Sequence, residues 1–96
     1  MQETAMSKRK DQQIAEAFRA LGHPVRLQIV RILQGEGACF AGEITRRLPV
    51  VASTASQHFK ILREAGLIND AVDGPHRYYS VDKQALRELK RWVSKL

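Results

Sequence analysis

Short polar side chains lie along one side of the segment 51–65. A helix turns by about 100° per residue, so a helix here would place four polar side chains opposite an apolar line. The polar residues are Ser53, Ser56, Gln57 and Lys60, and the apolar ones are Ala55, Phe59 and Leu62. Serine is an indifferent helix former, so helix propensity does not explain this composition. Hydroxyl and amide groups hydrogen bond to base edges in the major groove, which indicates recognition of DNA.

Cationic residues surround this polar face. Arg46, Arg47, Lys60 and Arg63 are close in sequence, and no acidic residue lies between Glu43 and Glu64. A polyanion would therefore approach this stretch without meeting a negative charge. The whole chain is also basic, because its 16 Lys and Arg outnumber its 10 Asp and Glu and give a net charge of +6. Such an excess favours a nucleic acid partner.

A chain of 96 residues makes a single domain whose core is small, so we expect an oligomer. The single cysteine, Cys39, excludes a disulfide or a multi-thiolate site within one chain and is typical of a reducing, cytoplasmic compartment. No apolar run approaches the roughly 18 residues of a membrane span. The start of the chain lacks the apolar stretch of a signal peptide, so we expect no membrane partner.

The order of elements follows from the periodicity. Residues 1–10 are polar and are expected to form a disordered basic tail, and residues 11–96 form the domain. The predicted helices cover residues 11–21, 24–34, 40–48 and 51–65, followed by strands 68–72 and 76–81. Asp82 is expected to cap a last helix that runs to Leu96. The turn between the strands is Asp73-Gly74-Pro75. The fold class is mainly α with a small β-hairpin, in the order α-α-α-α-β-β-α: a helix-turn-helix followed by a wing.

The second predicted helix, 24–34, is apolar over more than one face. We expect such a helix to be a central element that several neighbours cover. Its predicted core residues are Leu27, Val30, Ile32 and Leu33.

The last helix carries an apolar seam with steps of three, four and three residues, which is the spacing of a coiled coil. So short a helix is not stable alone. The predicted homodimer uses the first and last helices, through Ile14, Phe18, Leu86, Leu89, Trp92 and Val93. The alternative is that the seam packs only on the core of its own chain.

Four fragments in this order resemble the ArsR/SmtB family of bacterial winged-helix repressors. They are residues 20–30 (ALGHPVRLQIV), 42–44 (GEI), 53–67 (STASQHFKILREAGL) and 74–81, which contains Tyr78-Tyr79-Ser80-Val81. The resemblance covers about residues 11–96. It implies a homodimer that binds a pseudo-palindromic operator, blocks transcription and dissociates when an effector arrives.

The chain departs from the metal sensors of this family. Their third-helix site needs closely spaced cysteines, whereas only Cys39 occurs here, and the last helix contains no histidine. We therefore expect no metal at these sites and no cofactor, and the effector is unknown.

If the docking of the family applies, the segment 51–65 is the recognition helix. The predicted base contacts are Ser53, Ser56 and Gln57, with Thr54 either sharing that role or capping the helix. Arg46, Arg47, Lys60 and Arg63 are predicted to contact phosphate, and each arginine has the alternative of an ordinary solvated charge. The predicted wing is Gly74, Pro75 and His76, and Arg77 takes the place of the arginine that relatives carry next to the glycine.

His58 falls on the apolar side of the same helix and is predicted to be a buried structural histidine. An enzyme is not expected, because the sequence contains no HExxH motif, no phosphate-binding glycine loop and no nucleophile flanked by a base. Two alternatives to a simple repressor stay open: a redox-responsive repressor that uses Cys39, and a winged-helix protein-interaction module that does not bind DNA.

Overall fold

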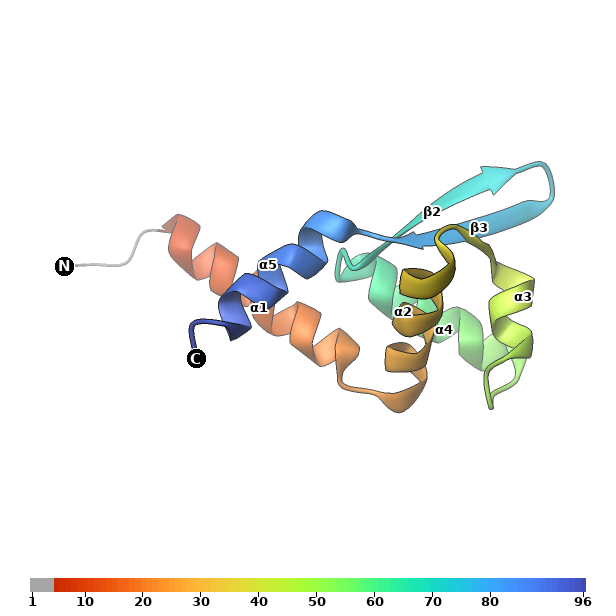
Figure 1. Ribbon diagram of the computed structural model, residues 1–96, viewed down its shortest axis with the longest axis horizontal. Coiled ribbons are helices and arrows are strands. Elements are labelled where there is room, and N and C mark those ends of the chain that lie inside the picture. The colour runs from red at the N-terminus through yellow and green to blue at the C-terminus, as the bar shows by residue number, and fades with distance from the viewer. Residues whose placement is uncertain (1–4) are drawn as a thin grey trace.

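The computed structural model describes residues 5–96, which form five helices and three short strands (Figure 1). The helices are α1 (Ala5–Leu21), α2 (Pro24–Glu36), α3 (Ala41–Arg46), α4 (Ala52–Glu64) and α5 (Lys83–Val93). The strands are β1 (Cys39–Phe40), β2 (Ile68–Asp73) and β3 (His76–Val81). The predicted fold class, a mainly helical winged helix-turn-helix, is confirmed, and β1 is an addition to the predicted order.

Helix α1 begins earlier than the sequence analysis placed it. Residues 5–10 were predicted to belong to a disordered tail, but they are helical, and residues 1–4 lie outside the described part of the chain. The segment contains alanine, methionine, lysine and arginine, which all favour helix, although it has no apolar period to reveal the helix. Lys10 also forms an ion pair with Glu88 of α5 at 3.0 Å, which ties the start of α1 to the last helix.

Helix α2 supplies the centre of the core. Ile29 and Leu33 are almost fully buried, and they pack with Ile44 of α3 and Leu62 of α4. The helix begins where the side chain of His23 accepts a hydrogen bond from the amide of Val25. Leu27, which was predicted to be a core residue, is 40% exposed, because it lies on a different side of α2 from the buried residues.

Helix α4 ends in a turn that directs the chain into the wing. The amide of Leu67 donates to the carbonyl of Leu62 (3.0 Å), and the amide of Gly66 donates to the carbonyl of Arg63 (3.0 Å). These two bonds make a Schellman motif, whose residue after the cap adopts a positive φ. Gly66 has φ 77°, a value that glycine adopts without steric cost.

The three strands form one antiparallel sheet in the order β1-β3-β2. The hairpin of β2 and β3 pairs Asp70 with Tyr79 and Asp73 with His76, and it extends away from the helices as a wing (Figure 1). Gly74, in the two-residue turn, has φ 61°, as tight hairpin turns require. Strand β1 pairs with the base of β3 through Cys39 and Tyr79.

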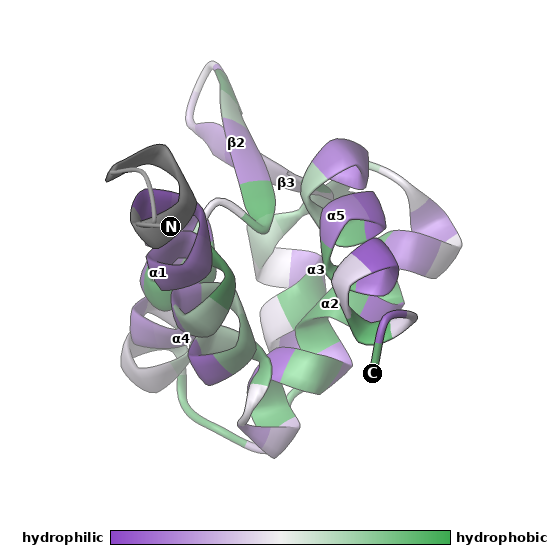
Figure 2. Ribbon diagram, turned by 90° about the vertical axis from the view of Figure 1, so that its left-hand side faces the viewer, coloured by the Kyte–Doolittle hydropathy of each residue, from purple (hydrophilic) through white to green (hydrophobic). Residues whose placement is uncertain are grey.

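Helix α5 starts at the predicted cap, since the carboxylate of Asp82 accepts a hydrogen bond from the amide of Ala85 (3.0 Å). It ends at Val93, so Leu96 lies beyond the helix and is 87% exposed. Figure 2 shows that α1 and α5 both carry hydrophilic outer faces and hydrophobic stripes. Among residues 5–96, no helix combines the length and the apolar character needed to cross a membrane.

Candidate nucleic-acid interface

Helix α4 has two chemically different faces. Ala55, Phe59 and Leu62 are at most 3% exposed and belong to the core. The residues predicted to contact bases, Ser53, Thr54, Ser56 and Gln57, are all exposed, as is Lys60. The polar side chains therefore face solvent on an element held rigidly by its buried side, as direct readout of a groove requires.

The N-terminus of α4 settles the alternative role of Thr54. The capping position is Val51, with no side-chain hydrogen bond at the cap, so Thr54 lies within the first turn and its hydroxyl does not cap the helix. Val51 is 68% exposed. Sequence reasoning did not single it out, although an apolar residue two positions after Pro49 and before a hydroxyl-rich helix is a signal, because apolar groups contact the thymine methyl.

A cleft of about 360 Å³ separates α3, α4 and the wing. Four of the predicted DNA-contacting residues line it: Ser56, Lys60, Arg63 and Arg77. Phe59 and Tyr79 form its apolar wall, with their rings stacked at 4.5 Å. The fold thus brings together cations from α4 and from β3, whereas Ser53, Thr54 and Gln57 lie outside this cleft on the exposed surface of α4.

Two of these cations share one carboxylate. Asp70 of β2 accepts a hydrogen bond from Nη1 of Arg77 at 2.9 Å, and its same Oδ2 atom lies 3.8 Å from Nη1 of Arg63. Asp70 pairs with Tyr79 across the hairpin, so Arg77 is its diagonal neighbour on the same face. Sequence reasoning missed Asp70, because its place beside Arg77 follows from the register of the hairpin.

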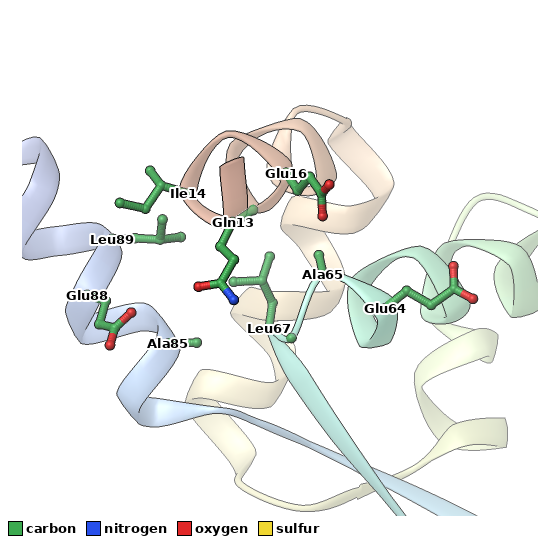
Figure 3. Close-up of a pocket in the computed structure, with 11 residues that line it drawn as sticks. Gln13, Ile14, Glu16, Glu64, Ala65, Leu67, Ala85, Glu88 and Leu89 are labelled. Atoms are coloured by element: carbon green, nitrogen blue, oxygen red, sulfur yellow. The ribbon is translucent and has the colours of Figure 1, made fainter. Parts of the chain in front are cut away.

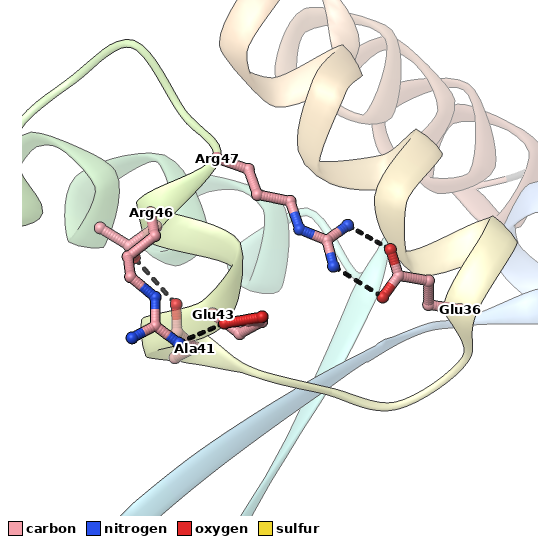
Figure 4. Close-up of polar contacts among 6 residues, drawn as sticks. Glu36, Ala41, Glu43, Arg46 and Arg47 are labelled. Carbon is pink, nitrogen blue, oxygen red and sulfur yellow. Dashed lines mark hydrogen bonds and ion pairs between the residues drawn. The ribbon is translucent and has the colours of Figure 1, made fainter.

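The two arginines of α3 and its turn are also paired, as Figure 4 shows. Arg46 contacts Glu43 within the helix, and Arg47 binds both carboxylate oxygens of Glu36 at the end of α2. The hydrogen bonds from Arg47 lower the pKa of Glu36, and the same bonds raise the pKa of Arg47. All four side chains are more than 40% exposed, so these pairs add little to folding stability and leave the guanidinium groups accessible.

His58 lies on the buried side of α4, as predicted, and is 9% exposed. Nη1 of Arg26 donates to its Nδ1 atom at 3.1 Å, and the ring of His23 lies 4.5 Å away. Arg26 also donates to the carbonyl of Ala20. Burial, together with the neighbouring His23 and Arg26, lowers the pKa of His58. This network joins the end of α1 and the start of α2 to the candidate recognition helix.

The wing tip, Gly74, Pro75 and His76, is exposed. The His76 ring packs edge-on against Phe40 of β1 at 4.7 Å, so β1 supports the wing at the start of β3. Tyr79 is buried and Tyr78 is half-buried, because neighbouring side chains on a strand point to opposite faces of the sheet.

Cys39 packs in the core and is 7% exposed. A cysteine in such a place acts as a small apolar side chain, and this position favours packing over oxidant sensing. Within the described residues, no three His, Cys, Asp or Glu side chains are grouped closely enough to hold a metal ion.

The predicted dimer surface is partly exposed and partly used by the chain itself. Phe18, Trp92 and Val93 are 37–47% exposed. The rings of Phe18 and Trp92 pack edge to face, with their centroids 5.7 Å apart. Ile14 and Leu86 are half-buried against the core, whereas Leu89 is 7% exposed and belongs to the core of its own chain. An apolar groove of about 520 Å³ runs along this face. It is lined by Phe18, Leu21, Gln34, Leu86, Leu89, Lys90, Val93 and Ser94.

A second cavity, of about 370 Å³, lies between α1, the end of α4 and α5 (Figure 3). Its floor is apolar, with Leu67 and Leu89, and the side chain of Gln13 extends between Leu67 and Glu88 in this view. The cavity shows that α1 and α5 do not pack tightly on each other here.

Comparison with known proteins agrees with this geometry. The helix-turn-helix domain family matches residues 21–71. The chain is 35% identical to the HTH-type transcriptional regulator YgaV of Escherichia coli over 93% of this chain and 90% of that protein. It is 32% identical to the transcriptional repressor SdpR of Bacillus subtilis over 79% and 83% of the two chains.

A solved structure gives the same fold. It is the homodimeric winged helix-turn-helix DNA-binding domain of a possible ArsR-family transcriptional regulator from Mycobacterium bovis. The TM-score is 0.80 at 24% identity, covering 96% of this chain and 84% of that one.

The fold and the exposed polar face of α4 define a winged-helix DNA-binding protein. The chain belongs to the helix-turn-helix domain family, and within it to the HTH-type transcriptional regulators.

Proposed function

We propose that this protein is a sequence-specific transcriptional repressor that binds a pseudo-palindromic operator as a homodimer. The observation that carries the proposal is the outer face of α4, where hydroxyl and amide side chains are exposed on a helix anchored by buried Ala55, Phe59 and Leu62. A helix of this kind fits the major groove. The similarity to a transcriptional repressor supports the direction of control.

Each α4 side chain has a role that follows from its position. Ser53, Ser56 and Gln57 contact base edges. Thr54 also contacts a base edge, because its hydroxyl does not cap the helix. Lys60 and Arg63, further along the helix, contact phosphate, because a long cation there reaches the backbone. Arg46, Arg47 and Arg77 bind phosphate from α3 and the wing, and Gly74, Pro75 and His76 flank the duplex at the wing tip.

The dimer is proposed from the apolar face of α1 and α5. Phe18, Trp92 and Val93 remain exposed in one chain beside an apolar groove, and a second copy that covers them would remove this surface from water. The homodimeric state of the Mycobacterium bovis domain supports this arrangement. A twofold axis would place the two α4 helices in successive major grooves, about 34 Å apart, which is why the operator is expected to be pseudo-palindromic.

The test is a titration of the purified protein against duplexes from the region upstream of its own gene, followed by fluorescence anisotropy. One palindromic fragment should bind at least about 1,000-fold more tightly than random DNA of equal length at the same salt concentration. Equal affinity for every duplex would overturn the proposal of sequence-specific binding.

The alternative without DNA binding is a protein-interaction module. The polar, cationic character of the α4 face and the wing argues against it, since such a module would present apolar or acidic groups there.

We also propose that the protein is not an enzyme and acts in the cytoplasm without a cofactor or a metal at the usual sites of the family. Substituting Cys39→Ser tests the redox alternative: release of operator by peroxide that persists in the variant would exclude the thiol.

A further inference from the structure

We propose that Asp70 is an internal competitor of DNA, a carboxylate that occupies Arg63 and Arg77 in the free protein and that a backbone phosphate displaces. The inference rests on the proposed function, because it concerns the phosphate contacts of the same interface. It adds one acidic residue to the proposed DNA interface, whose other polar residues are cationic or neutral.

The geometry at Asp70 links two elements that DNA would contact separately. Arg63 comes from the last turn of α4, and Arg77 comes from β3 of the wing. Both direct Nη1 at the single Oδ2 atom of Asp70, at 3.8 and 2.9 Å. The carboxylate therefore stands where the wing meets the recognition helix.

The cleft beside these arginines has the chemistry of a phosphate site. Lys60, Arg63 and Arg77 line it together with Ser56, which gives three cations and one hydroxyl. The hydroxyl of Thr45, also at the cleft, donates to the carbonyl of Ala41 (2.9 Å). The cleft volume of about 360 Å³ admits a phosphate group, and guanidinium groups bind phosphate in the same forked geometry as a carboxylate. Asp70 thus offers Arg63 and Arg77 the kind of partner that DNA would offer.

The exchange is feasible because the ion pairs are exposed. The side chains of Arg63, Arg77 and Asp70 are 34%, 46% and 29% exposed, and pairs of this kind are weak in water. A phosphate that enters the cleft also meets the negative charge of Asp70 at close range. Both effects lower the affinity for any DNA sequence, so Asp70 acts on the phosphate contribution and not on base recognition.

The experiment compares Asp70→Asn with the wild-type protein on operator and on random duplexes over a range of salt concentrations. Asparagine keeps the shape and a carbonyl oxygen that accepts from arginine, but it removes the charge. We expect about two- to fivefold tighter binding to both duplexes at low salt. The gain should shrink as salt rises, because salt also screens the internal pair, so the variant should show the steeper salt dependence.

Asp73→Asn is the matched control. Asp73 ends the same strand and is exposed, and the described residues contain no ion pair with it, so its substitution measures the general effect of removing one negative charge from the wing. The variant Arg63→Gln/Arg77→Gln is a second background. In it, Asp70→Asn should have no effect beyond that of Asp73→Asn, because the side chains through which Asp70 acts are absent.

The outcomes separate this inference from the proposed function. If the wild-type protein binds its operator but Asp70→Asn binds no more tightly than Asp73→Asn, the competitor role is wrong and the repressor proposal stands. If Asp70→Asn weakens binding while circular dichroism shows an unchanged melting curve, Asp70 aligns the arginines instead, and the inference is overturned. If the wild-type protein binds no duplex even at low salt, both proposals fall.

Discussion

Two surfaces of this molecule expose side chains that need a partner, and their chemistry is opposite. The outer face of α4 and the adjoining wing present hydroxyls, an amide and cations, whereas the face of α1 and α5 presents Phe18, Trp92 and Val93. On the first surface, the arginines pair with internal carboxylates such as Asp70 and Glu36, whereas Lys60 forms no ion pair within the described residues. The second surface contains an apolar groove. A groove of this kind carries no charge that a side chain of the same chain could neutralise.

This contrast indicates how each surface should respond to change. Contacts between cations and phosphate exchange with salt and with internal carboxylates, so single substitutions there have graded effects. Apolar contacts depend on excluding water, so one charge introduced among them should be severely disruptive.

Val93→Glu should cause the largest effect, because it places an unpaired carboxylate in the proposed dimer interface. Burial of such a charge costs about 3 kcal/mol or more, roughly 100-fold in the dimer dissociation constant. Sedimentation velocity at micromolar concentration should detect monomers. Gln84→Glu, at an exposed site of α5, makes the same change of charge and should remain dimeric. A Val93→Glu protein that stays dimeric would remove this face from the interface.

Gln57→Ala should relax sequence preference by about 1–3 kcal/mol at the base pair that Gln57 contacts. The reason is the loss of an amide that can pair with adenine in two places. Anisotropy titrations with operator and random duplexes measure the change, and Gln84→Ala, on the distant α5, serves as the control. An equal loss on both duplexes would mean that Gln57 does not read bases.

Lys60→Ala should weaken binding to all duplexes alike and lower the slope of log K against log salt by about one unit for each phosphate that the variant no longer neutralises. Lys60 lines the cationic cleft and, in the described chain, forms no ion pair. Lys83→Ala removes the same charge from α5, where Lys83 is exposed, and should leave the slope nearly unchanged. A slope equal in Lys60→Ala and wild type would show that Lys60 does not contact phosphate.

The smallest expected effect is on the pH dependence of folding stability. It concerns His58 and its contacts with Arg26 and His23 on the buried side of α4. The pKa of His58 is lowered in the folded protein, so the unfolded chain binds more protons below the ordinary value of about 6.5. Stability is therefore complete above pH 6.5 and falls as the pH drops toward the lowered pKa. Urea unfolding between pH 8 and 5 should show this decline.

His58→Gln is the control for that decline. Glutamine can still accept a hydrogen bond from Arg26 but does not titrate, so the variant should lose less stability between pH 8 and 5 than the wild-type protein. Parallel pH profiles of the two proteins would assign the decline to other groups.

Local patterns in the sequence were sufficient for most of the fold. The cap at Asp82, the turn at Gly74 and the two faces of α4 were all predicted, because each depends on residues within one or two turns of the chain. The strand β1 was not predicted. It has two residues, Cys39 and Phe40, and it exists only because β3, nearly 40 positions later, pairs with it.

The candidate DNA interface was also predictable only in part. The residue types on α4 could be assigned to bases or phosphates from their spacing alone. Their electrostatic partners could not, since Arg47 pairs with Glu36 and Arg63 with Asp70 across separate elements. Pairing of this kind depends on side-chain direction and on how helices cross, which a single sequence does not reveal.

The sequence by itself determined which side of α4 is polar, the excess of positive charge and, except at the start of α1, where the helices begin and end to within a few residues. The reason is that helical period and composition are local properties. The tertiary structure alone decided that the arginines are already paired, that Leu89 belongs to the core of its own chain, and that His58 meets Arg26 from 32 residues away. The physical reason is that burial and ion pairing depend on distances through space, and packing brings together residues that the chain keeps far apart.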